Sequence, residues 1–260
     1  MDSEKDIVSM MTEEEARKLH LPGCDVFLRT QLAYRDEINR EALVIFLKRE
    51  AYQAFTDTIL IGQYPLLQQE KEMQKRDWRI FTPTIFRQME YRYLDNFKIA
   101  AGFELHLKAC LVAKNIVIHQ IADKMSQFEE LRKRQKKTPV YGNELLDIEG
   151  FYYNGKLNIL RGLLSKTLDF NQILNSSMYR AQLGKPQDIL GIVDDYRNLR
   201  NQIHLPRDFV EAPHLNKYQG DSLMQILVKF INEEIVEYYN AIVEKGKWHP
   251  SYNLQALTYF

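Results

Sequence analysis

The amino-acid sequence predicts an all-α protein. Its 260 residues include only 11 glycines and 8 prolines, and long segments of helical apolar periodicity run between them. A hydrophobic content of 45% is enough for a core, and a charged content of 27% is ordinary for a soluble protein. No segment approaches the roughly 20 apolar residues that a transmembrane helix needs. We therefore expect a helical protein with no membrane association.

Charge and cysteine content indicate which partners and which cellular location to expect. Lysine plus arginine equals aspartate plus glutamate, 35 each, so no overall field attracts nucleic acid, and RNA binding would depend on local patches. The only cysteines are Cys24 and Cys110, which exclude a disulfide scaffold and suit a reducing cytoplasm. The N-terminus lacks the apolar core of a signal peptide. We expect a cytoplasmic location.

In the first half of the chain, helices are expected where a capping residue precedes a periodic apolar run. A short helix begins at Thr12 and stops at Pro22, and a second covers 25–61. Residues 66–82 are expected to form a helix or an ordered connector. Thr82-Pro83-Thr84 then begins a helix that reaches about Lys114, long enough for a central rod.

The second half continues the pattern. One helix is expected to end near Gln135, and another to begin after the capping residue Asn143. Further helices are expected over 151–174 (with a break near Gly155 or Gly162), 187–204 and 221–245. The loop 207–220 is long for a helix–helix connection, and functional loops are often of this kind. The aromatic segment 246–260 is expected to dock on the chain itself or on a partner.

Four polar residues share one side of the helix 187–204. At about 100° per residue, Arg197, Arg200, Asn201 and His204 occupy an arc of roughly 100° beside the apolar stripe of this helix. We call these four residues the polar arc. Two guanidiniums, an amide and an imidazole on one rigid surface suit phosphate chemistry. The alternative is that the arginines pair with Asp194, Asp195 or a partner helix.

The helix 84–114 carries polar residues with two possible roles. Glu104 and Lys108 have the spacing of a helical surface ion pair, or Glu104 could instead reach the polar arc. His106 and Cys110 are also four residues apart, a spacing that can hold a metal, but companion ligands are lacking. We therefore expect no metal site.

The strongest basic cluster is residues 132–137, which place five cations in six positions, including Arg132, Lys133 and Lys136. Such a run often forms a solvated helix end, where positive charge is favoured by the helix dipole. It could equally bind RNA phosphates. Both interpretations stay open at this stage.

Two separated stretches together resemble the HEPN family of helical domains. Residues 103–111, followed by His119, resemble its opening helix, and Arg197-Asn198 with His204 resembles the family's arginine–polar–histidine motif at its longest spacing. Only three residues separate Arg200 from His204, which is shorter than the spacing in the family. The resemblance therefore assigns the catalytic arginine to Arg197. The resemblance covers a bundle at 84–245. Residues 1–83 would be a helical N-terminal extension, and 246–260 an aromatic tail.

The resemblance implies a homodimeric, metal-independent endoribonuclease without cofactors, from a toxin or phage-defence system, controlled by an antitoxin or sensor protein. His204 would act as general acid or base near neutral pH. Arg197, supported by Arg200, would hold the scissile phosphate. Asn198 or Asn201 would orient the imidazole or ribose. Supporting roles would fall to Glu104 and Lys108, and RNA binding to Arg132, Lys133 and Lys136.

Two other functions remain compatible with the sequence. A member of the same fold without cleavage activity would serve as an adaptor, or as a regulatory or nucleotide-binding subunit of a defence complex. An unrelated helical interaction protein would use Arg197 and Arg200 only for ion pairs.

Overall fold

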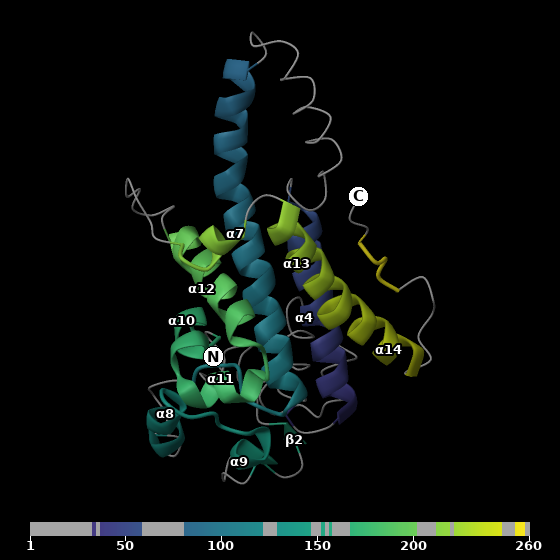
Figure 1. Cartoon of the computed structure of the whole chain (residues 1–260). Coiled ribbons are helices and arrows are strands. Elements are labelled where there is room, and N and C mark those ends of the chain that lie inside the picture. The colour runs from purple at the N-terminus through teal and green to yellow at the C-terminus, as the bar shows by residue number, and fades with distance from the viewer. Residues whose placement is uncertain are drawn as a thin grey trace, which may run out of the picture. The chain divides into compact units, whose positions relative to one another are not determined.

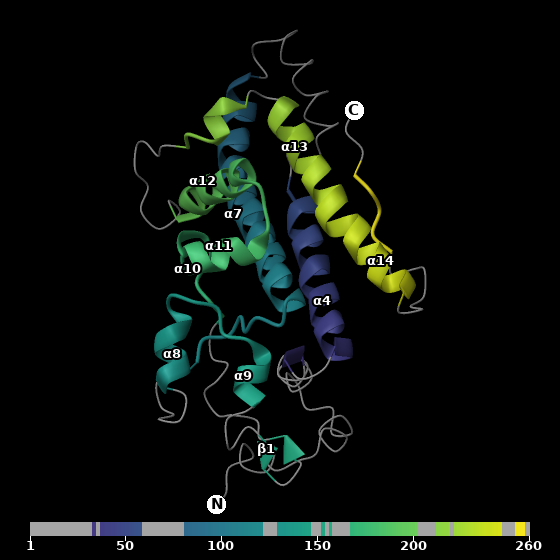
Figure 2. The ribbon, with the colours of Figure 1, turned by 60° about the horizontal axis from the view of Figure 1, so that its bottom comes forward.

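The computed structural model describes residues 33–34, 37–58, 81–121, 129–146, 152–153, 156–157, 167–201, 212–218, 221–245 and 253–257 (Figures 1 and 2). Helices dominate these residues, so the predicted all-α class is confirmed. None of the described helices combines the length and apolar composition that a membrane crossing requires.

The α-helices are α4 (Glu37–Thr56), α7 (Phe81–Ala113), α8 (Glu129–Gln135), α9 (Gly142–Leu146), α10 (Phe170–Asn175), α11 (Ser177–Leu183), α12 (Gln187–Asn201), α13 (Asp221–Ile231) and α14 (Tyr238–Lys245). A 3-10 turn, η3 (Leu215–Lys217), precedes α13, and a π-helical segment, η4 (Asn232–Glu237), joins α13 to α14. The short strands β1 (Tyr152–Tyr153) and β2 (Lys156–Leu157) pair antiparallel.

Two predicted helices are confirmed almost to the residue. The helix expected over 84–114 is α7, and the one expected over 221–245 is the continuous run of α13, η4 and α14. The helix expected over 25–61 is represented by α4. The helix expected from Thr12, the connector at 66–82 before Phe81 and most of the loop 207–220 lie outside the described residues.

The helix expected over 151–174 is wrong at 152–157 and confirmed from Phe170, where α10 begins. Here β1 pairs with β2, Tyr152 opposite Leu157 and Tyr153 opposite Lys156. Residues 158–166 lie outside the described residues. Tyrosine favours strands, and the sequence Asn-Gly between the strands is the strongest short hairpin signal. Apolar richness alone does not distinguish a buried helix from a strand.

The chain divides into two compact units, each built from two separated segments. Unit 1 comprises Met1–Phe46 and Lys108–Gly184, and unit 2 comprises Leu47–Leu107 and Lys185–Phe260. The sequence-based boundaries at 83/84 and 245/246 do not coincide with the borders of these units.

Unit 1 is organised by a buried glutamine at the end of α8. The Gln135 side chain accepts a hydrogen bond from the Ile121 N–H at 3.1 Å and donates to the His119 carbonyl at 2.7 Å. The main-chain carbonyl of Gln135 accepts hydrogen bonds from Gln172 Nε2 at 2.6 Å and from the Tyr179 hydroxyl at 2.9 Å. One residue of the basic cluster therefore ties together three segments distant in sequence.

Unit 2 is organised by the ring of Phe103 on α7. Its centroid lies 5.1 Å from that of Phe55 on α4, 5.3 Å from that of Phe230 on α13 and 6.0 Å from that of Tyr196 on α12. Four helices thus contribute one ring each to a buried aromatic cluster. Next to it, a Cβ on Gly102 would lie 2.9 Å from the Phe55 ring, so only glycine allows this close approach.

Replacing Phe103 with alanine is expected to lower the free energy of unfolding by about 3–5 kcal/mol, because it removes the ring that all three others contact. Phe97→Ala on the same helix is the matched control, since that side chain is 47% exposed and should cost less than about 1 kcal/mol. Urea unfolding of both variants measures the difference, and equal losses would contradict the central role of Phe103.

Candidate functional site

Helix α12 carries three of the four residues of the polar arc, Arg197, Arg200 and Asn201. Ile192, Val193 and Tyr196 are buried and fix which side of the helix faces the core. Arg197, Asn198 and Arg200 are only partly exposed, and Asn201, the last described residue of α12, is exposed. His204 lies outside the described residues. The helix that presents the arginines is therefore confirmed, whereas the histidine's position remains a prediction.

Arg200 is held by a carboxylate of another helix. Its Nη1 donates to Glu104 Oε2 at 2.7 Å, and the two side chains are 25% and 21% exposed. The contact links α7 to α12 within unit 2. Glu104 therefore reaches the polar arc, which is the sharper of its two predicted roles.

Arg197 is held by its own helix. Its Nε donates to Asp194 Oδ1 at 2.8 Å and its Nη2 donates to Asn198 Oδ1 at 3.0 Å. The Arg197 side chain is 13% exposed, and the two hydrogen bonds orient its guanidinium. The predicted alternative, in which arginines pair with nearby carboxylates, thus describes the contacts of both Arg197 and Arg200. A phosphate bound here would compete with Asp194 and Glu104 for the same donors.

Asp195 does something the sequence did not predict. It is buried, and its Oδ2 accepts hydrogen bonds from the backbone N–H groups of His214 and Leu215 at 2.7 and 2.8 Å. The His214 ring, with Nδ1 3.3 Å from Asp195 Oδ1, lies against Gly191, where a Cβ would meet it at 2.2 Å. Asp195 therefore docks part of the predicted functional loop onto α12. The only sequence signal was Gly191 and Asp195 four residues apart on one face.

The other histidines on or near α7 belong to the cores of their units. Burial, helped by the charges of Lys48 and Lys185, holds the pKa of His106 well below its ordinary value, and its ring packs against Phe230. No group of three or more histidine, cysteine or acidic side chains able to hold a metal occurs among the described residues.

In unit 1, Lys108 is buried and its Nζ donates to Thr167 Oγ1 at 2.7 Å. Burial, with a smaller contribution from the charge of Lys108, lowers the pKa of His119 to about 4. The Tyr34 hydroxyl accepts the Ile118 N–H at 3.0 Å, which leaves its proton to donate to His119 Nδ1 at 2.7 Å. His119 is therefore a neutral, hydrogen-bonded core residue. The expected ion pair between Lys108 and Glu104 remains a prediction.

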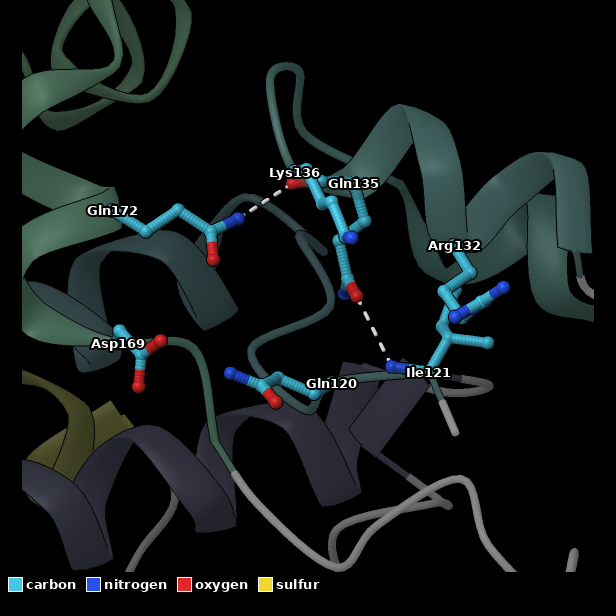
Figure 3. Close-up of a pocket in the computed structure, with 7 residues that line it drawn as sticks. All are labelled: Gln120, Ile121, Arg132, Gln135, Lys136, Asp169 and Gln172. Atoms are coloured by element: carbon cyan, nitrogen blue, oxygen red, sulfur yellow. Dashed lines mark hydrogen bonds between the residues drawn. The ribbon is translucent and has the colours of Figure 1, made fainter. Parts of the chain in front are cut away.

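The basic cluster borders a polar cavity of about 390 Å³ in unit 1, shown in Figure 3. Its walls comprise Gln120, Ile121, Arg132, Gln135, Lys136, Asp169 and Gln172. Lys133 pairs with Glu129 at 2.7 Å on the exposed side of α8, and Arg134 pairs with Glu144. Two of the three predicted RNA-binding residues, Arg132 and Lys136, are thus brought together at one hollow. Its charges suit a polar ligand with an anionic group.

No protein-family model, characterised protein or solved structure matches the chain. The resemblance to HEPN domains therefore depends on the two motifs and on the contact between the helices that carry them.

The Arg200–Glu104 contact should show measurable coupling. Glu104→Gln and Arg200→Gln, alone and combined, form a double-mutant cycle for which we expect a coupling energy of about 1 kcal/mol, because the pair is partly shielded from solvent. Urea unfolding at low and high salt measures it, and the coupling should fall with salt. Strictly additive losses would show that the pair does not stabilise the protein.

Acid should destabilise unit 1 through His119. The folded pKa of about 4 lies below the unfolded value of about 6.5, so between these values the unfolded chain binds more protons and stability falls as pH falls. The loss attributable to His119 is at most about 3 kcal/mol. His119→Gln keeps an oxygen that can accept from Tyr34. Urea unfolding from pH 7 to 4 should show a shallower pH dependence in this variant, and an unchanged slope would contradict the assignment.

Proposed function

We propose that the protein is a metal-independent endoribonuclease of the HEPN type, acting as a homodimer with a composite Arg/His site in a toxin or phage-defence setting. One observation supports it most. The two stretches that carry the family resemblance are about ninety residues apart in sequence, yet Glu104 from the first contacts Arg200 from the second at 2.7 Å. The contact places the two stretches on adjacent helices, as a shared site would require.

In the proposed reaction, His204 removes the proton of an RNA 2′-hydroxyl, and the resulting oxygen attacks the adjacent phosphorus. The bond to the 5′-oxygen breaks, and that oxygen takes a proton from a protonated imidazole, which the second protomer would supply. The products are a 2′,3′-cyclic phosphate and a 5′-hydroxyl. No metal is needed to balance these steps.

The arginines would stabilise the charge that develops on the phosphate. Arg197 is assigned to the scissile phosphate because of its spacing from His204, and its guanidinium is already oriented by Asp194 and Asn198. Arg200, oriented by Glu104, would support it. Fixed donors need no reorganisation when charge builds up, which is the main benefit of such preorganisation. Asn201 would contact the ribose or the imidazole.

RNA binding is assigned to Arg132, Lys133 and Lys136. Arg132 and Lys136 line the cavity of unit 1, and Lys133 is on the exposed surface of α8. Phosphate contacts by such cations release counterions, so binding should weaken with salt. An antitoxin or sensor protein is the proposed controlling partner.

A second candidate is a non-catalytic member of the same fold, acting as an adaptor or regulatory subunit. The contacts of Arg197 with Asp194 and of Arg200 with Glu104 favour it, because both guanidiniums engage carboxylates. In this case the arginines would stabilise the bundle or bind a nucleotide, and His204 would have no proton to transfer.

RNA cleavage in the presence of EDTA distinguishes the two. We expect the wild type to cut RNA and His204→Ala and Arg197→Ala to lose at least about 100-fold in rate, as removal of an acid–base group or a charge-stabilising donor typically does. Arg49→Ala, an exposed arginine on α4, is the matched control and should retain full activity.

Chemical identification of the cut ends should find 2′,3′-cyclic phosphates. A wild type that cuts no RNA, or a His204→Ala variant that cuts equally well, would reject the nuclease and favour the adaptor. Sizing in solution adds a test, since a strict monomer at high concentration cannot form a composite site.

A further inference from the structure

A short segment near the C-terminus is clamped by two asparagines. On α14, Asn240 Oδ1 accepts the Leu254 N–H at 2.8 Å, and its Nδ2 donates to the Leu254 carbonyl at 3.0 Å. On η4, Asn232 makes the same pair of bonds to Leu257, both at 2.7 Å. Each side-chain amide thus satisfies both main-chain groups of one tail residue. The expectation that the C-terminal tail docks on the chain itself is confirmed for residues 253–257.

A third side chain completes the clamp. The Tyr52 hydroxyl on α4 donates to the Gln255 carbonyl at 2.9 Å. We call Asn232, Asn240 and Tyr52 the asparagine clamp. All five of its hydrogen bonds go to main-chain atoms, so the clamp recognises the peptide backbone and not particular side chains.

The positions of the tail side chains indicate what else the clamp requires. Leu254 and Leu257 are half-buried, whereas Gln255 and Ala256 between them are exposed. The bound segment therefore presents apolar side chains three residues apart. Its direction is antiparallel to the helix, because Asn232 holds the later tail residue and Asn240 the earlier one.

The π-helical segment η4 aligns the two asparagines. Eight residues of regular α-helix would place Asn232 and Asn240 about 80° apart around the axis. The wider π turns of η4, which take about one residue more per turn, reduce this offset. The eight residues rise at most about 12 Å, because π turns rise less per residue than α turns, and three residues of an extended chain span about 10 Å, so the two clamped positions match in spacing. π-Helical turns are rare and frequently lie at functional sites.

We propose that the asparagine clamp is a binding site for an extended peptide segment of a partner protein, with apolar side chains at its first and fourth positions, and that residues 253–257 are its intramolecular occupant. Because recognition is through the backbone, any extended segment with apolar side chains at its first and fourth positions could bind. The tail holds the site because tethering gives it an effective concentration in the millimolar range. The inference does not depend on the proposed nuclease.

The test uses the full-length chain and a fluorescent peptide with the sequence of residues 251–260. Leu254→Pro with Leu257→Pro removes the two N–H groups that donate to the asparagines and should release the tail. We expect this variant to bind the peptide at least tenfold more tightly than the wild type does. Adding Asn232→Ala and Asn240→Ala should weaken binding by about tenfold for each asparagine.

Two peptides provide a matched control. N-methylation at the residues equivalent to Leu254 and Leu257 should abolish binding, while N-methylation at those equivalent to Gln255 and Ala256 should not, because only the first pair donates to the clamp. No binding to the proline variant, or binding that ignores the asparagine substitutions or the methylation pattern, would overturn the proposal.

A measurement on the wild type guards against misfolding of the proline variant. Millimolar unmodified peptide should raise the hydrogen exchange of the Leu254 and Leu257 amides by displacing the tail, whereas the peptide methylated at those positions should not. Unchanged exchange would overturn the proposal. Dimerisation of the wild type that is lost in Asn232→Ala/Asn240→Ala would also overturn it, since the occupant would then be the tail of a second copy.

Discussion

The register between α7 and α12 is the constraint on which the candidate site depends. Two successive residues of α7 contact two residues one turn apart on α12, since Phe103 packs near Tyr196 and Glu104 pairs with Arg200. The aromatic contact is buried and supplies the stability, whereas the ion pair at its edge supplies the orientation. A shift of one residue along either helix would break both contacts, because it rotates the side chains by about 100°.

Several buried and half-buried polar side chains position the backbone of other segments. Gln135 joins three segments of unit 1, Asp195 holds the backbone of a loop against α12, and Asn232 and Asn240 hold the tail. A buried polar side chain is costly unless its hydrogen bonds are satisfied, so each of these residues strongly favours a single arrangement of its partner segment. Specific geometry is therefore set by a few amides and carboxylates around apolar cores.

These contacts also bear on the choice between the two candidate functions. The guanidiniums of Arg197 and Arg200 are partly shielded from solvent and each contacts a carboxylate. In a nuclease, these carboxylates would orient the arginines until a phosphate takes their place. In an adaptor, the arginine–carboxylate contacts would be permanent. The two functions differ in whether His204 transfers a proton and in whether a second protomer completes the site.

How far the sequence predicts the structure depends on whether a feature is local. The helices α7 and α13–α14 and the placement of Arg197 and Arg200 on one side of α12 could be read from periodicity and capping, because helix geometry repeats along the chain. The hairpin at 152–157 was missed because apolar richness outweighed a strong turn signal. Each of the two compact units joins segments far apart in sequence, and local periodicity carries no signal of that.

By itself, then, the sequence determined the helical class and the surface on which the arginines lie, and it remains the only basis for His204. The tertiary structure decided which partner each polar residue has. Glu104 pairs with Arg200, Asp195 holds a loop, and Asn232 and Asn240 hold the tail. Such choices depend on which segments pack together, and local periodicity carries no information about that.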